Sequence, residues 1–297
     1  GQLGDGSSIN KIVPEAIASS QKFTKLSSGY LHSCGISENS KLICWGNNSY
    51  GPIGDGTTVR RATPVDIDST YNYSEIGLGG NHSCGIATGG ELKCWGSNAF
   101  GQLGDGTTTM SLLPKVIDSG VSYKAVALGY GTTCGLTTAG GLKCWGSNYA
   151  KQLGDGTNVN KLSPIVVDSD HAYQSIAVGA GHICGVTTAG VVRCLGDNQY
   201  GQLGDGTTLS KASPIVVDPG VSYTQVFAKG SFTCGKLATG GFKCWGGTFQ
   251  SNGTAVNRLN PYDPTNGIEV FEALSLGSSH ICGLTNSGAN STKVKCW

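Results

Sequence analysis

Short runs in which apolar and polar residues alternate recur along the chain, and none has the 3.6-residue apolar period of a helix. In residues 51–100 the alternation covers 73–79, 82–86 and 92–96, with a Thr-Gly-Gly turn at 88–90. A proline-led segment at 64–67 precedes these runs and is typical of extended backbone. The pattern therefore predicts four short strands in each 50-residue stretch and an all-β fold.

The pattern returns every 50 residues. GQLGDG at 1–6 reappears as GPIGDG at 51–56, GQLGDG at 101–106, KQLGDG at 151–156 and GQLGDG at 201–206. A sixth unit begins near Ser251, lacks the Gly-Asp-Gly turn and realigns at Pro264, Phe271, Gly277, His280 and Cys282. We therefore predict one domain over 1–297, built from six repeats at 1–50, 51–100, 101–150, 151–200, 201–250 and 251–297.

A single four-stranded unit cannot bury both of its faces, whereas stacked units can, so we expect a closed β-propeller of six four-stranded blades. The last residues, Lys295-Cys296-Trp297, stop at the point of the repeat where Gly1 resumes it. We expect the N-terminal strand Lys11–Ile17 to complete the last blade beside residues 293–297. The alternative is a seven-bladed ring from which one unit is missing.

The repeated sequence G-x-x-H-S-C-G-I-x-x-x-G-x-L-x-C-W-G-x-N-x-x-G-Q-L-G-D-G-T resembles the regulator of chromosome condensation repeat family. The resemblance covers the whole chain, and five of the six units match closely. It implies a propeller that engages protein partners through one face. The family's founder is usually drawn with seven blades, so six units are a departure. The wider group includes a nucleotide-exchange factor for a small GTPase and a secreted inhibitor of β-lactamases.

Each repeat carries two cysteines, and five of the six pairs have the spacing C-x9-C. A three-residue hairpin turn would place the two cysteines directly opposite each other, within disulfide distance. Zinc sites generally need C-x2–4-C spacing, which is absent, and reduced buried cysteines remain the other alternative. Disulfides indicate an oxidising compartment. The predicted pairs are Cys34 with Cys44, Cys84 with Cys94, Cys134 with Cys144, Cys184 with Cys194, Cys234 with Cys244, and Cys282 with Cys296.

Other recurrent residues have both a structural and a functional interpretation, and we favour the structural one for each. Tryptophans after the second cysteine (Leu195 in one repeat) predict core rather than a ligand platform: Trp45, Trp95, Trp145, Trp245 and Trp297. Ring residues before the first cysteine predict packing between blades: Phe23, Tyr73, Tyr123, Tyr173, Tyr223 and Phe271. Histidines predict hydrogen bonding rather than a metal funnel: His32, His82, His182 and His280. Aspartates predict turn capping rather than calcium binding: Asp5, Asp55, Asp105, Asp155 and Asp205.

Composition narrows the function classes further. Charged residues make up 13% of the chain and the net charge is +1, which argues against nucleic acid or an anionic membrane as partner. No apolar run is long enough for a transmembrane helix. The only methionine is Met110, so we expect a processed protein or a piece of a longer one. Glycosylation sequons occur at Asn47, Asn72, Asn81, Asn252 and Asn290.

No nucleophile elbow, HExxH or P-loop sequence is present, so we predict no enzyme, no catalytic residue, no cofactor and no metal site. The segments that differ most between repeats are 7–13, 18–22 and 47–50, where loops on a rigid frame would carry recognition. We predict a secreted or cell-surface protein-binding scaffold of unknown partner. The alternative is self-assembly, as a building block of an extracellular filament or adhesin. A secreted enzyme inhibitor or a guanine-nucleotide exchange factor fits less well.

Overall fold

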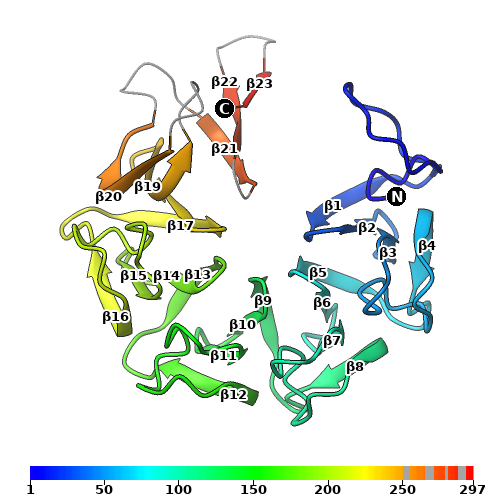
Figure 1. Ribbon diagram of the computed structural model, residues 1–297, viewed down its shortest axis with the longest axis horizontal. Helices are drawn as coiled ribbons and strands as arrows, with labels where there is room; N and C mark the ends of the chain where they lie inside the picture. The colour runs from blue at the N-terminus through cyan, green and yellow to red at the C-terminus, as the bar shows by residue number, and fades with distance from the viewer. Residues whose placement is uncertain (250–254, 265–270, 278–279, 287–291, 297) are drawn as a thin grey trace. The chain divides into compact units, whose positions relative to one another are not determined.

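The computed structural model describes residues 1–249, 255–264, 271–277, 280–286 and 292–296. All regular structure in these residues is β, in 23 strands and without a helix. The strands form six successive antiparallel sheets, and strands that follow one another in the chain lie side by side in each sheet (Figure 1). This arrangement is that of an all-β propeller with six blades, as predicted.

The strands of the first three sheets are β1 (Phe23–Ser28), β2 (His32–Ser37), β3 (Leu42–Gly46) and β4 (Arg61–Ile67); β5 (Tyr73–Leu78), β6 (His82–Ala87), β7 (Leu92–Gly96) and β8 (Ser111–Ile117); and β9 (Tyr123–Leu128), β10 (Thr132–Thr137), β11 (Leu142–Gly146) and β12 (Lys161–Asp168). Those of the last three are β13 (Tyr173–Val178), β14 (His182–Thr187), β15 (Val192–Gly196) and β16 (Lys211–Val217); β17 (Tyr223–Lys229), β18 (Phe232–Leu237), β19 (Phe242–Phe249) and β20 (Ala255–Tyr262); and β21 (Phe271–Leu276), β22 (Ile281–Asn286) and β23 (Thr292–Cys296).

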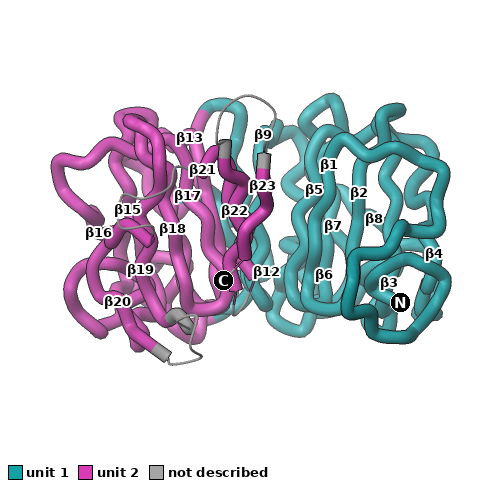
Figure 2. Tube along the Cα trace, turned by 90° about the horizontal axis from the view of Figure 1, so that it is seen from above, with its two compact units in different colours: residues 1–139, 143–147, 160–166 teal, residues 140–142, 148–159, 167–297 magenta. Residues whose placement is uncertain are grey.

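Each four-stranded sheet crosses a boundary between sequence repeats. The first three strands come from one repeat, and the fourth strand, which contains a proline, comes from the next, as β4 does beside β3. The chain forms two compact units (Figure 2). Unit 1 contains residues 1–139, 143–147 and 160–166, and unit 2 contains residues 140–142, 148–159 and 167–297.

The core lies between successive sheets, as the recurrent apolar residues predict. In unit 1, Trp95 and Tyr73 of the second sheet pack in one cluster with Cys34, Leu42 and Cys44 of the first. The Trp95 Nε1 atom donates a hydrogen bond to the Pro52 carbonyl over 2.9 Å. Trp45, Trp145, Trp245 and Leu195 are likewise buried at the equivalent position, whereas Trp297 lies outside the described residues.

All six predicted cysteine pairs are bonded in the structure. They are Cys34 and Cys44, Cys84 and Cys94, Cys134 and Cys144, Cys184 and Cys194, Cys234 and Cys244, and Cys282 and Cys296. In the second pair, for example, the two cysteines are directly opposed on β6 and β7, with their Cα atoms 4.1 Å apart.

The pairs differ in their exposure. The ten cysteines of the first five pairs, among them Cys144, Cys194 and Cys244, have no exposed surface. In the sixth pair Cys282 is partly exposed and Cys296 is exposed. Five of the disulfides therefore belong to the core, and the sixth lies closer to solvent.

The expected strand at Lys11–Ile17 is not formed. Residues 11–17 contain no strand, and the last sheet has three strands, β21–β23, among the residues described. The physical difference from the other repeats is the connection. Each fourth strand follows a third strand of its own sheet through one loop, as β4 follows β3, whereas residues 11–17 are not joined by a loop to β23, the third strand of the last sheet.

Candidate protein-binding face

One end of unit 1 gathers five short segments from three sheets. The turns between the first and second strands of these sheets are 29–31, 79–81 and 129–131. The segments 47–50 and 97–100, which follow β3 and β7, are tied to these turns by hydrogen bonds from Asn47 N to Leu31 O and from Ser97 N to Asn81 O. We call these five segments the aromatic end. The opposite hairpin end carries the tips 38–41 and 88–91 and the linkers 68–72 and 118–122.

The three turns of the aromatic end are bonded to one another. Tyr30 N donates to Gly79 O over 3.3 Å, and Gly80 N donates to Gly129 O over 3.2 Å. This approach requires glycine. A Cβ atom at Gly79 would lie 2.3 Å from Cε1 of His82 and 2.7 Å from Gly129 O. The absence of side chains at Gly79 and Gly80 therefore lets the backbone of successive blades make contact.

Buried histidines join the blades just beneath these turns. His32 Nε2 lies 2.9 Å from Ser83 Oγ, and His82 Nε2 lies 2.8 Å from Thr133 Oγ1. Each hydroxyl donates its own proton to a backbone carbonyl, at Pro52 and Gln102. The hydroxyl oxygen must then accept from the histidine, so the proton of each ring is on Nε2.

The second ring nitrogen, Nδ1, is buried without a hydrogen-bond partner in both His82 and His182. Burial lowers the pKa of His82 to about 3, with a smaller effect from the nearby His32. Burial likewise lowers the pKa of His182, which bonds Thr233 over 2.7 Å, to about 4. These three histidines therefore have the predicted hydrogen-bonding role, whereas His280 is exposed. We call each histidine and its hydroxyl partner a histidine latch.

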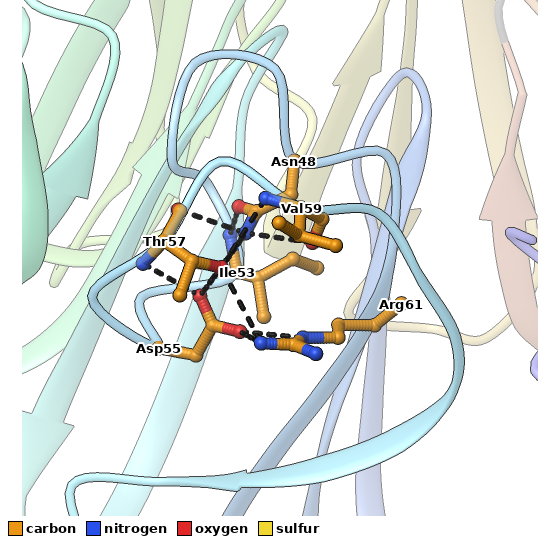
Figure 3. A network of polar contacts seen from close by, with 6 residues as sticks. All are labelled: Asn48, Ile53, Asp55, Thr57, Val59 and Arg61. Carbon is orange, nitrogen blue, oxygen red and sulfur yellow. Dashed lines mark hydrogen bonds and ion pairs between the residues drawn. The ribbon is translucent and has the colours of Figure 1, made fainter.

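A buried asparagine fixes the loop that follows β3 (Figure 3). Asn48 Nδ2 donates to Asp55 Oδ1 over 3.1 Å, to Thr57 O over 2.9 Å and to Val59 O over 3.1 Å. Its Oδ1 accepts from Ile53 N over 3.0 Å. One side chain thus satisfies backbone groups spread over residues 53–59 and gives the loop a single conformation. The same contacts recur at Asn98, Asn148 and Asn198.

Asp55 caps the turn, as predicted for the repeated aspartates. Its carboxylate accepts from Thr57 N over 3.0 Å and pairs with the Arg61 guanidinium. Burial alone would raise the pKa of Asp55, but hydrogen bonds from Thr57, Arg61 and Asn48 outweigh it and hold the pKa below its usual value. The other four aspartates accept from the backbone two residues later in the same way.

Aromatic side chains stand on this fixed backbone and face solvent. The exposed fractions are 69% for Tyr30, 52% for Tyr50, 40% for Phe100 and 59% for Tyr130. A Cβ atom at Gly80 would lie 3.0 Å from the Tyr130 ring, and one at Gly131 would lie 2.8 Å from the Phe100 ring. Both rings thus rest on glycine backbone and leave their outer faces exposed.

The five segments contain no Asp, Glu, Lys, Arg or His. They consist mainly of Tyr, Phe, Gly, Asn and Ser. The hairpin end differs, because it carries Glu38, Lys41 and Glu91 at its tips, and Asp68 bonds both the Tyr73 hydroxyl and the Lys93 amine. Exposed rings with uncharged hydrogen-bonding groups are typical of protein-binding loops.

Of the three segments predicted to carry recognition, 47–50 lies at the aromatic end. Residues 18–22 lie at the hairpin end, where Lys22 O accepts from Glu38 N, and residues 7–13 follow the Asp5 turn. Tyr30 and Tyr130 are not among the residues predicted from the sequence to carry recognition. The signal was a departure from the repeat, because the equivalent residues are Gly80 and Ala180.

The sequons fall at both ends. Asn47 and Asn81 lie within the aromatic end and Asn72 lies at the hairpin end, whereas Asn252 and Asn290 fall outside the described residues. In the part of the chain that the structure describes, no group of three or more His, Cys, Asp and Glu side chains is placed to hold a metal ion. The same residues include no helix with the length and apolarity to cross a membrane.

Comparison with known proteins supports the fold. Two models described as the regulator of chromosome condensation (RCC1) repeat match the chain, one at 23–51, 73–102, 123–152 and 173–202, and the other at 90–136 and 140–186. Together they cover more than half of the chain. No curated protein matches it.

Three crystal structures illustrate the structural similarity. Human WBSCR16 has a TM-score of 0.82 and 20% identity, over 92% of this chain and 75% of its own. Yeast RCC1 (Prp20), solved with Kap60, has a TM-score of 0.76 and 19% identity, over 89% of this chain and 68% of its own. The ectodomain of the receptor kinase CR4 from Physcomitrella patens has a TM-score of 0.61 and 24% identity, over 93% of this chain and 62% of its own. At these identities the likeness is one of fold.

Proposed function

Because the chain belongs to the regulator of chromosome condensation (RCC1) repeat family, we propose that it is a protein-binding scaffold of the cell exterior or cell surface, acting through the aromatic end of unit 1. The observation that carries this proposal is the set of exposed rings at Tyr30, Tyr50, Phe100 and Tyr130 on uncharged, rigidly held loops. The few residues that carry most of the binding energy of a protein interface are enriched in aromatic side chains, so this end is the strongest candidate contact surface in unit 1.

Rigidity supports the same conclusion. The turns are bonded to one another through Tyr30 N and Gly80 N, and the loops are held by Asn48 and Asn98. A surface whose backbone is already ordered loses little conformational entropy when a partner binds. Tyrosine and phenylalanine add a large contact area for only two side-chain torsions each.

The six disulfides support this compartment. Ten of the twelve cysteines are fully buried and paired within their own hairpins, an arrangement that persists in oxidising surroundings and is rare in the cytosol. The CR4 structure is the ectodomain of a receptor kinase, which shows that the fold occurs outside cells. Protein partners are found for another propeller of this fold, since the Prp20p structure was described together with its binding to Gsp1p and histones.

Self-assembly through strand edges is the less favoured function. The outermost strands β4, β8, β12 and β16 each carry a proline near the middle, at Pro64, Pro114, Pro164 and Pro214. Proline cannot donate a ladder hydrogen bond, so these edges are poor templates for pairing with another copy. A filament would need to use faces other than these strand edges.

Site-specific photo-cross-linking tests the proposal. The chain is made with p-benzoylphenylalanine at position 130, and a second version carries it at position 88, at the hairpin end. Both are incubated with intact cells of the source and their culture medium, irradiated, and separated by mass. A protein adduct at position 130 that is absent at position 88 supports the proposal. Equal adducts at both positions, or none at 130, would contradict it.

A further inference from the structure

We propose that the partner of the aromatic end is a protein segment that carries no charged side chain where it makes contact, presenting apolar and uncharged polar groups instead. This inference rests on the proposed function and specifies the chemistry of that same surface. It follows from the charge of the five segments, from the hydrogen-bonding groups they offer and from the way their rings are supported.

Desolvation makes a charged partner group unfavourable at this surface. A charged partner group pressed against the aromatic end would lose its water and meet no ionic side chain in the segments 29–31, 47–50, 79–81, 97–100 and 129–131. An unpaired charge that is buried in an interface weakens binding strongly. The surface therefore selects against acidic and basic segments of either sign and favours neutral ones.

The polar groups of this surface are neutral as well. The backbone donors Tyr30 N and Gly80 N are already bonded to the neighbouring turns, so they hold the surface together. Hydroxyls of Tyr30 and Tyr130 and the amide of Asn81 are the side-chain groups that the turns present. Such groups match the backbone carbonyls and amides of an extended or looped protein segment.

The rings supply the apolar part of the contact. Tyr130 rests on Gly80 and Phe100 rests on Gly131, which places two supported rings on neighbouring blades. Because glycine backbone lies beneath them, the rings are held from below, while the two residues remain 59% and 40% exposed. We assign Tyr130 and Phe100 as the anchor pair of the contact.

The test uses a phage-displayed library of random linear 12-residue peptides, selected on the immobilised chain with its disulfides intact. Peptides that bind are synthesised, and their affinities are measured for the parent and for Tyr130→Ala. Ala99 is exposed beside Phe100, so Ala99→Glu and Ala99→Lys introduce either charge into the surface. Thr88→Glu and Thr88→Lys place the same charges on the hairpin end as matched controls.

We expect enriched peptides with fewer Asp, Glu, Lys and Arg than the input library. Tyr130→Ala should weaken them at least about tenfold, a usual effect of removing an anchor ring. Ala99→Glu and Ala99→Lys should weaken binding by similar factors, the Thr88 variants should leave it unchanged, and raising NaCl from 50 to 500 mM should alter affinity less than about twofold.

The neutral-partner inference would be overturned if the enriched peptides are charged, and if one of Ala99→Glu and Ala99→Lys strengthens their binding while the other weakens it. If these peptides still need Tyr130, the proposal that this end binds proteins would stand. Peptides that bind without need of Tyr130 would overturn both. Two neutral sugars, cellohexaose and chitohexaose, and a second copy of the chain are assayed in parallel by calorimetry and sedimentation. If no peptide is enriched and a sugar or a second copy of the chain binds in a manner that depends on Tyr130, the inference is overturned in favour of that ligand.

Discussion

Acid should destabilise this protein through the histidine latches, well before its carboxylates titrate. His82 and His182 are fully buried, donate from Nε2 to a threonine of the next blade, and have no partner at Nδ1. A proton added to Nδ1 would place an unpaired positive charge between two blades. Burial accordingly lowers the pKa of His82 to about 3 and that of His182 to about 4.

The sign and size of the effect follow from linkage. In the unfolded chain each histidine takes up a proton near pH 6.5, whereas in the folded chain it stays neutral until the pH falls much further. The free energy of unfolding therefore falls as the pH drops below about 6.5, and it stops falling near the folded pKa values. At pH 5 the pH is about 1.5 units below the unfolded pKa, which corresponds to about 2 kcal/mol for each of His82 and His182 and about 4 kcal/mol for these two together.

Equilibrium unfolding in guanidinium chloride at pH 7 and pH 5, with disulfides intact, measures this loss. The parent should lose about 4 kcal/mol from the latches of His82 and His182 over this interval. His82→Gln with His182→Gln keeps a nitrogen donor for Thr133 and Thr233 but cannot titrate, so its unfolding free energy should change little between the two pH values. Nitrogen chemical shifts of the two rings should show protonated Nε2 and unprotonated Nδ1 at pH 5.

A second variant copies a contact that the protein already contains. At the positions equivalent to a latch, Phe232 and Ile281 lie together in one hydrophobic cluster. His182→Phe with Thr233→Ile should therefore remove about half of the pH dependence and keep the fold. The prediction is refuted if the double glutamine variant loses as much stability between pH 7 and pH 5 as the parent does, because the latches of His82 and His182 would then not carry the acid sensitivity.

Three further predictions concern covalent and steric features. Intact mass under non-reducing conditions should lie about 12 Da below that of the reduced chain, since each disulfide removes two hydrogens, and free thiols would contradict the pairing. Asn98→Ala should lower the unfolding free energy by about 2–4 kcal/mol, because it strips bonds from Thr107 O, Thr109 O and Leu103 N, whereas Asn47→Ala, at an exposed bond to Ser49 N, should cost less than about 1 kcal/mol. Gly79→Ala should destabilise by more than about 2 kcal/mol, while Gly89→Ala, with no atom within 4 Å, should be neutral or slightly stabilising; equal melting temperatures would refute the clash.

Most of the fold was predictable because each repeat shows the same residues at the same positions, so positions that the fold requires can be recognised by their recurrence. The hairpin turn at 88–90 and the C-x9-C spacing together fix the register that places Cys84 opposite Cys94. Tyr73 and Trp95 recur at fixed positions, which indicated the core between blades. The absence of a strand at 11–17 was not predictable in the same way, because the sequence of this segment matches that of a fourth strand while its connection does not.

The candidate face could not be found from the repeats, for the opposite reason. Residues that recur in the repeats are those that the fold of each blade requires. Asn48 and Asp55 are examples, because both hold loops in place. Tyr30 and Tyr130 break the repeat, and a single irregular residue carries no periodic signal. Only the topology shows that the turns at 29–31 and 129–131 share one end with the loop residues Tyr50 and Phe100.

The histidine latch was not predicted as a contact between blades, although the sequence contains a pattern that indicates it. In three repeats a Gly-x-x-His sequence is followed, 51 residues after the histidine, by Ser83, Thr133 or Thr233. Where Phe232 replaces the histidine, Lys229 replaces the glycine and Ile281 replaces the hydroxyl residue. Where Thr132 replaces the histidine, Ile183 replaces the hydroxyl residue and Gly129 is kept. The structure explains why the histidine and the hydroxyl residue change together. A Cβ atom at Gly179 would lie 2.1 Å from Cε1 of His182, so the ring needs glycine, and its Nε2 proton needs a hydroxyl oxygen on the next blade. Residues that vary as a set between repeats therefore reveal a contact, whereas a residue that varies alone, as Tyr130 does, is free to serve a partner.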